Sequence, residues 1–235
     1  MLSLNQQGEV VYVNPQEHYR IGLEVLLLSL LVLALLAFGG WTGVKALLSF
    51  VFAAMILWRV LVPALLKGMD PILVSLGVVS SLTAVIIFLV AGLNRKGVVA
   101  FTGAMLGVLT SCGLALVFTN SFKINGAVLP FAETLLYSGF SHLDLVRIFV
   151  AAVFLAASGA VMDIAVDVAA SLDEVVRKSP DMSRMEVVRS GLRVGRAVVG
   201  TMTTTLLLAY SGGYVTLPMA FMAQGVPLTN LANLV

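Results

Sequence analysis

Long apolar runs dominate the chain and restrict its fold more than any other feature of the sequence. A helix of about 20 apolar residues crosses a hydrocarbon core of about 30 Å. Inside that core only structures that satisfy their own backbone hydrogen bonds are stable. Six runs reach or approach this length: Ile21–Gly40, Val44–Leu66, Pro71–Leu93, Val98–Thr119, Leu145–Asp167 and Val194–Ser211. We therefore expect an all-α fold, a polytopic transmembrane helix bundle.

A seventh run, Tyr214–Val235, is a poorer candidate because glycine and proline disfavour a helix. Four residues interrupt it: Gly225, Pro227, Asn230 and Asn233. The composition supports a membrane chain, since only 11% of the 235 residues are charged, against about 25% in soluble domains. The sequence therefore predicts six or seven spans. Residues 1–20 are polar and mildly strand-like; we expect an extracytoplasmic segment that is the tail of a missing domain, followed by a transmembrane domain over residues 21–235.

The basic residues predict the orientation, because loops rich in Lys and Arg stay on the cytoplasmic side. Six such residues lie between the fifth and sixth runs or at the start of the sixth: Arg177, Lys178, Arg184, Arg189, Arg193 and Arg196. We expect the loop over residues 168–193 to be cytoplasmic and the N-terminal segment to face outward, in a bacterial inner membrane. Ser183 and Glu186 form a capping-box pattern, which predicts an amphipathic helix along the cytoplasmic interface.

Asp163 is placed too deep for an ordinary helix end. The uncharged stretch Ile148–Met162 has 15 residues, about 22 Å of helix, roughly 8 Å less than the hydrocarbon thickness. Arg147 has a long stem that can reach back to the interface, whereas an aspartate cannot. Asp163 therefore falls inside the membrane, where ionisable groups usually have a function. Asp167 lies one turn later on the same face, so the pair is a candidate proton-relay or ion-coupling site.

The sixth run offers a facing surface for these carboxylates. Arg196, Gly200 and Thr204 recur at four-residue spacing and share one stripe. We take Arg196 and Thr204 as further relay candidates, and Gly159 and Gly200 as positions of close helix packing. The alternative is structural: Arg196 pairs with Asp163, and the threonines bond their own backbone carbonyls. The spacings Gly103–Gly107 and Gly191–Gly195 also suit close packing.

A second deep charge, Arg59, lies in the outer part of the second run. Glu24, at the outer end of the first run, is its expected partner. Under the predicted topology Arg59 is too far outward to meet Asp163. We therefore interpret Glu24 and Arg59 as a structural ion pair.

Signatures of enzymes and of bound metals are missing from the sequence. It contains no Walker loop and no HExxH motif, and its two histidines have no spacing that suggests a metal site. We expect no enzyme activity, no cofactor and no metal, and the small net charge of +2 argues against nucleic acid. Membrane lipids are expected partners, while an ion or small-molecule substrate and a homo- or hetero-oligomer are left open. The stretch Ser141–Asp144 predicts a helix start with Ser141 as its cap.

Three segments carry a resemblance to a known family: "GAVMDIAVDVAASLDEV", "VVRSGLRVGRAVVGTMTTTLLLAY" and "LPMAFM". They resemble the core of the YibE/F-like bacterial membrane proteins, over most of the chain from Tyr12 onward. The resemblance implies a polytopic protein and no particular reaction. A weaker, fold-level similarity extends to SecD, SecF and half-units of resistance-nodulation-division transporters, which implies a proton path through Asp163. The deep lysine of the drug exporters is missing here.

The expected function is that of a transporter or a proton-coupled membrane motor subunit that uses a carboxylate within a span. The alternative is an assembly or scaffold protein that transports nothing and whose intramembrane charges are structural. Replacing Asp163 by asparagine distinguishes the two, because only the first depends on a proton at that position.

Overall fold

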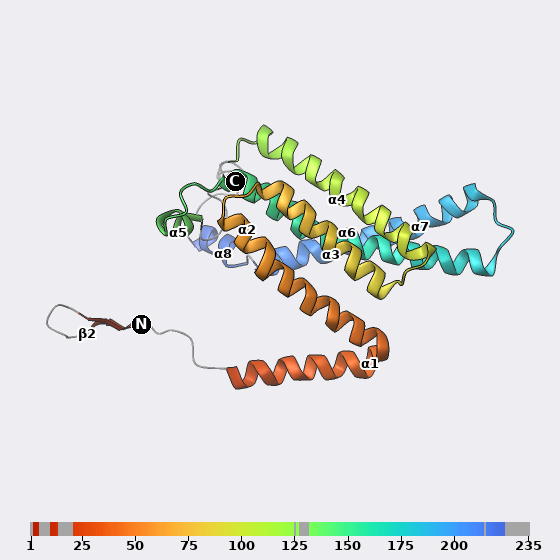
Figure 1. The fold of residues 1–235 in the computed structure, drawn as a ribbon, viewed down its shortest axis with the longest axis horizontal. Coiled ribbons are helices and arrows are strands. Elements are labelled where there is room, and N and C mark those ends of the chain that lie inside the picture. Colours follow the sequence, from red (N-terminus) through yellow and green to blue (C-terminus); the bar gives the residue numbers. More distant parts are fainter. Residues whose placement is uncertain are drawn as a thin grey trace. The chain divides into compact units, whose positions relative to one another are not determined.

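The computed structural model describes residues 2–4, 10–13, 21–124, 126, 132–213 and 215–223. These form two compact units, Met1–Leu48 and Ser49–Val235, and the elements are shown in Figure 1. The helices after the first one are η1 (Leu57–Leu61), α2 (Val62–Leu66), α3 (Pro71–Val90), α4 (Arg95–Ser121), α5 (Ala132–Tyr137), α6 (Leu145–Lys178), α7 (Arg184–Gly213) and α8 (Thr216–Ala223).

The first unit contains a small hairpin and most of α1 (Ile21–Ile56). Strands β1 (Leu2–Leu4) and β2 (Val10–Val13) pair antiparallel, with Leu2 opposite Val13. Helix α1 is bent at Gly40, whose φ of 50° lies in the left-handed region. Glycine adopts that conformation without the steric cost that a Cβ adds. The two predicted runs on either side of this bend therefore form one kinked helix.

In the second unit, η1 is a π-helical segment directly before a proline. Pro63 has no backbone N–H and its ring excludes the carbonyl four residues earlier. The N–H of Val62 donates instead to the carbonyl of Leu57, five residues back. Such π-bulges relieve the disrupted helical ladder. Arg59 therefore lies within an irregular turn.

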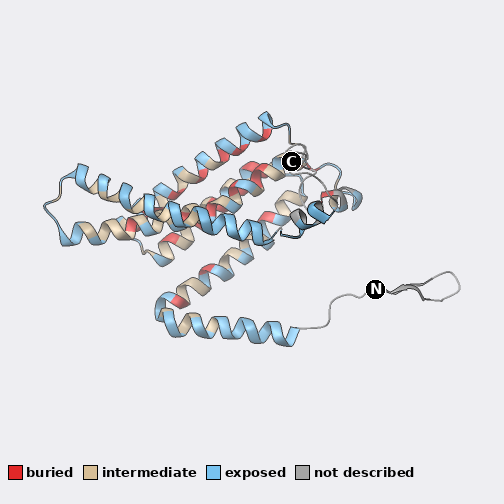
Figure 2. Ribbon diagram, turned by 180° about the vertical axis from the view of Figure 1, so that it is seen from behind, coloured by how far each residue is buried: buried red, intermediate tan, exposed pale blue. Residues whose placement is uncertain are grey.

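The core of the second unit is formed by α3, α4 and α6. Phe154 of α6, Val79 of α3 and Val108 of α4 are completely buried and belong to one cluster. A second cluster near the other end joins Ile87 with Met162 and small residues of α4. Figure 2 shows these buried positions along the facing sides of the helices. The buried residues of α4 recur about every four positions, which gives it one packed face.

Glycine allows two of the helix contacts to be close. A Cβ at Gly107 of α4 would lie 2.5 Å from Val161 of α6, and one at Gly191 of α7 would lie 3.0 Å from Leu172. At Gly159 and Gly200 a Cβ would meet nothing within 4 Å among the described residues. The packing role predicted for these two stays a prediction.

Among the residues that the structure describes, four helices are long and apolar enough to cross a membrane: Ile21–Leu66, Pro71–Val90, Arg95–Ser121 and Leu145–Lys178. The predicted count of six or seven spans is not confirmed. The predicted sixth run belongs to α7, whose apolar residues are interrupted by an arginine and by threonines. The predicted seventh run lies mostly outside the described residues.

Candidate functional site

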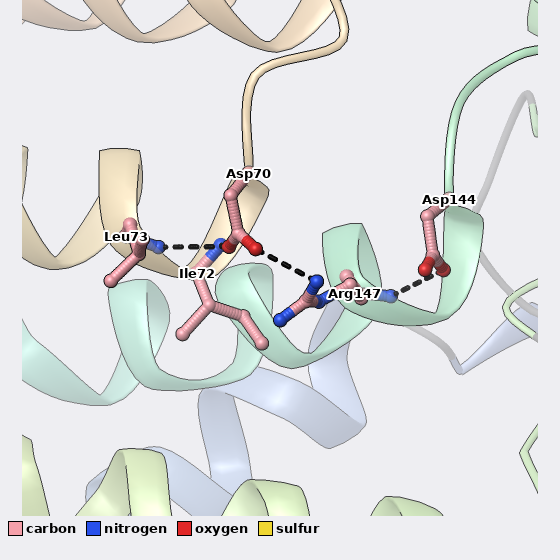
Figure 3. A network of polar contacts seen from close by, with 5 residues as sticks. All are labelled: Asp70, Ile72, Leu73, Asp144 and Arg147. Carbon is pink, nitrogen blue, oxygen red and sulfur yellow. Dashed lines mark hydrogen bonds and ion pairs between the residues drawn. The ribbon is translucent and has the colours of Figure 1, made fainter.

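Two aspartates and one arginine fix the starts of α3 and α6. Asp70 caps α3 by accepting hydrogen bonds from the N–H groups of Ile72 and Leu73, at 3.0 and 3.2 Å. Asp144 caps α6 by accepting one from Arg147 N–H at 3.0 Å. The Arg147 guanidinium also contacts the Asp70 carboxylate at 2.8 Å (Figure 3). Asp144 therefore caps α6, and the prediction that Ser141 is the cap is wrong.

Arg147 therefore points back to the helix ends, as its long stem allows. Its partner belongs to α3 and could not be identified from the sequence, because the two residues lie far apart in the chain. The uncharged stretch of α6 then begins next to a paired cation. The stretch ends just before Asp163. Asp163 lies 19 positions after the capping residue Asp144, which is about 28 Å along the helix.

Asp163 and Asp167 line one cavity. It has a volume of about 260 Å³ and lies between α3, α6 and α7. Its other lining residues are apolar: Ile86, Val90, Met162, Val166 and Met202. Both aspartates are exposed on the surface of the described chain, and neither makes an ion pair there. The structure thus brings together the two predicted carboxylates, and sequence reasoning missed the residues from α3 and α7.

A buried hydroxyl lies close to this cavity along α3. Thr83 is completely buried and its Oγ1 has no hydrogen-bond partner among the described residues. It precedes Ile86, which lines the cavity, by less than one turn. On α6, Ser158 is also buried, and its hydroxyl donates to the carbonyl of Leu155 at 2.6 Å. An unpaired buried polar group is rare enough to need a reason.

Arg196 lies on a different side of α7. It lines a second cavity, of about 680 Å³, between α6 and α7. Among the described residues no ion pair joins it to Asp163 or Asp167. Thr204 is exposed, and its hydroxyl donates to the carbonyl of Gly200 at 3.3 Å. The other hydroxyls of this threonine run donate to backbone carbonyls three or four residues back in the same way. Hydrogen bonds of the threonines to their own backbone are what the structural alternative expects. The relay roles of Arg196 and Thr204 stay predictions.

The predicted ion pair of Glu24 and Arg59 also stays a prediction. Glu24 lies in the first unit and Arg59 in the second. Arg59 lines a cavity of about 320 Å³ with apolar neighbours from α1 and η1. Across the described part of the chain, no group of three or more His, Cys, Asp or Glu side chains could hold a metal ion.

The start of α7 follows the predicted capping box. The Ser183 N–H donates to the Glu186 carboxylate at 2.8 Å, and the Glu186 N–H donates to the Ser183 hydroxyl at 3.3 Å. The backbone N–H of Ser183, and after it the Ser183 hydroxyl, hold the pKa of the exposed Glu186 carboxyl below its ordinary value. Helix α7 then continues unbroken to Gly213. The predicted interfacial helix and the sixth run are therefore parts of one helix.

A protein-family model matches the chain. No curated protein and no solved structure matches the chain, and the similarity to SecD and SecF is not confirmed. The model of the YibE/F-like protein family matches residues 27–235, which is nearly the whole chain. With its long apolar helices, the chain is a membrane protein and belongs to the YibE/F-like family.

Proposed function

We propose that the chain is a transporter or a proton-coupled membrane motor subunit, and not an enzyme, in which Asp163 takes up and releases a proton. The observation that carries this proposal is the cavity between α3, α6 and α7. It places Asp163 and Asp167 together at the end of a long uncharged stretch, with otherwise apolar lining. An ionisable group within a span usually marks an ion pathway or a proton relay.

The proposed topology has six or seven spans. The helical stretch Ile21–Leu66 has 46 residues, about 69 Å, which is more than twice the hydrocarbon thickness. Its bend at Gly40 allows it to cross the membrane twice. The apolar half of α7 supplies a further span, and the basic connection between α6 and α7 faces the cytoplasm. Asp163 then lies in the cytoplasmic half of the bacterial inner membrane.

The chemistry follows from the surroundings of the two carboxylates. A negative charge in an apolar cavity is costly, and two carboxylates on one helix face repel each other. A proton on one of them relieves both costs. The unpaired hydroxyl of Thr83 can accept or donate a hydrogen bond, and we include it in the proposed path because it lies less than one turn before the lining residue Ile86.

Complementation of a deletion strain tests this function. The strain is profiled for growth under ionic and chemical stress, and any phenotype that depends on the proton gradient is then measured with Asp163→Asn. Asp173→Asn is the matched control, because it makes the same change on the same helix outside the cavity, in a residue paired with Arg177 at 3.0 Å. We expect Asp163→Asn to fail and Asp173→Asn to complement at equal expression.

The scaffold alternative makes a different prediction for the same pair of variants. If the charges only hold helices together, Asp163→Asn changes stability in detergent and leaves every gradient-dependent phenotype intact. Full complementation by a normally expressed Asp163→Asn protein would therefore overturn the proposed function.

A further inference from the structure

The cavity that Arg196 lines is an open apolar groove between α6 and α7. Val168 and Leu172 of α6 form one wall, and Leu192 and Val199 of α7 form the other. Gly191 and Gly195 lie between them, where Leu172 and Val168 approach the backbone of α7. Leu192 and Val199 are 56% and 48% exposed, so among the described residues nothing covers this wall. Figure 2 shows the exposed side of α7.

Positive charge lies along this groove without a matching negative charge. Arg196 lines it. Arg189 and Arg193 precede Arg196 on the same helix, outside the groove lining, and all three are exposed. None of them forms an ion pair within the part of the chain that the structure describes. The basic residues of α6 differ, because Arg177 and Lys178 pair with acidic residues one turn earlier. Asp163 and Asp167 of α6 line the other cavity.

The depth of Arg196 follows from the antiparallel packing of the two helices. Gly195 lies beside Val168, and Gly191 lies beside Leu172. Arg196 is therefore level with Asp167, which is 22 positions after Leu145, or about 33 Å of helix. That length matches the hydrocarbon thickness of about 30 Å. Arg196 lies at the membrane boundary, and Val199 lies about one turn deeper.

We propose that this groove binds an anionic phospholipid, with the phosphate on Arg196 and one acyl chain along Val199 and Gly200, the lining residues that lie deeper than Arg196. Basic pockets between membrane helices recognise acidic headgroups, and an arginine binds phosphate through two parallel hydrogen bonds. A Cβ at Gly200 would meet nothing within 4 Å among the described residues, so there is room for the chain beside Val199. Leu192 lies about 6 Å from Arg196 toward the cytoplasm, at the depth of the headgroups. This site is separate from the proposed proton site.

Native mass spectrometry of the full chain, released from detergent, measures the binding. The probes are phosphatidylglycerol, phosphatidylcholine of the same acyl chains, and inorganic phosphate. We expect preferential binding of phosphatidylglycerol, which Arg196→Gln weakens by about tenfold or more and Arg196→Lys partly retains. Arg193→Gln removes the same charge outside the groove lining and should weaken binding by about twofold at most.

A charge-neutral variant tests the apolar part of the groove. A Cβ at Gly200 meets nothing within 4 Å, so Gly200→Leu places its side chain into the groove without a clash. We expect it to reduce phosphatidylglycerol binding while the protein stays folded. Equal losses in Arg196→Gln and Arg193→Gln, equal binding of both lipids, or displacement of the lipid by inorganic phosphate would each overturn the proposal.

Discussion

The close contact between α4 and α6 makes Gly107 a sensitive packing position. A Cβ there lies 2.5 Å from a methyl group of Val161, whereas carbon atoms pack at about 3.5–4.0 Å. The helices must separate by about 1 Å, because a valine in a helix has one strongly preferred rotamer. Overpacking of this kind costs about 1–3 kcal/mol.

Gly113, also on α4, is the matched control for Gly107→Ala. A Cβ there meets nothing within 4 Å, so Gly113→Ala changes only the helix propensity. That gain, about 1 kcal/mol in water, is common to both variants and cancels in their difference. We expect Gly107→Ala to be less stable than Gly113→Ala by about 1–3 kcal/mol, measured by unfolding in SDS followed by circular dichroism. Equal stabilities would refute this account of the α4–α6 contact.

Three further predictions concern polar groups. Asp70→Ala should destabilise by about 1 kcal/mol more than Arg147→Ala, because it removes a helix cap as well as a half-exposed ion pair; the reverse order in thermal unfolding would contradict this. The lowered pKa of Glu186 means that its bonds with Ser183 stabilise the start of α7 above the ordinary pKa of glutamate. That stabilisation is lost as the pH falls through the lowered pKa. The protection of the amides there, measured as the exchange rate relative to that of the unfolded chain at the same pH, should fall in acid in the parent but not in Glu186→Gln. Thr83→Val should keep or raise stability, since it removes an unpaired buried hydroxyl, yet weaken complementation; unchanged complementation would exclude Thr83 from the path.

Local patterns predicted the parts of the structure that depend on neighbours in sequence. The capping box of Ser183 and Glu186 forms as expected, since both partners lie within one turn. Asp163 and Asp167 line the same cavity because their spacing alone places them on one helix face. The close contacts at Gly107 and Gly191 likewise follow from glycine spacing and helix geometry.

Features that depend on how helices are rotated against one another could not be predicted. The position of Arg196 in the sequence does not show whether its side chain faces Asp163 or the groove on the other side of α7. In the structure it lines the groove. The pairing of Arg147 with Asp70 requires the ends of α3 and α6 to be side by side. At the start of α6 both Ser141 and Asp144 are suitable caps by residue type, and the backbone geometry decides for Asp144.

Carbodiimide labelling of the folded full-length protein, mapped by mass spectrometry, tests the central claim most directly. The reagent reacts with a carboxyl group that carries a proton, and an apolar cavity protects the product from water. Labelling requires no knowledge of the substrate. Asp173, on the same helix but paired with Arg177, is the internal control.

The account predicts that Asp163 is labelled, that labelling slows as the pH rises, and that Asp163→Asn abolishes it while Asp173→Asn does not. A proton site at Asp163 would be contradicted by the opposite result. In that result only Asp173 and the other carboxylates outside the cavity are labelled, and Asp163 stays unmodified at every pH at which the protein stays folded.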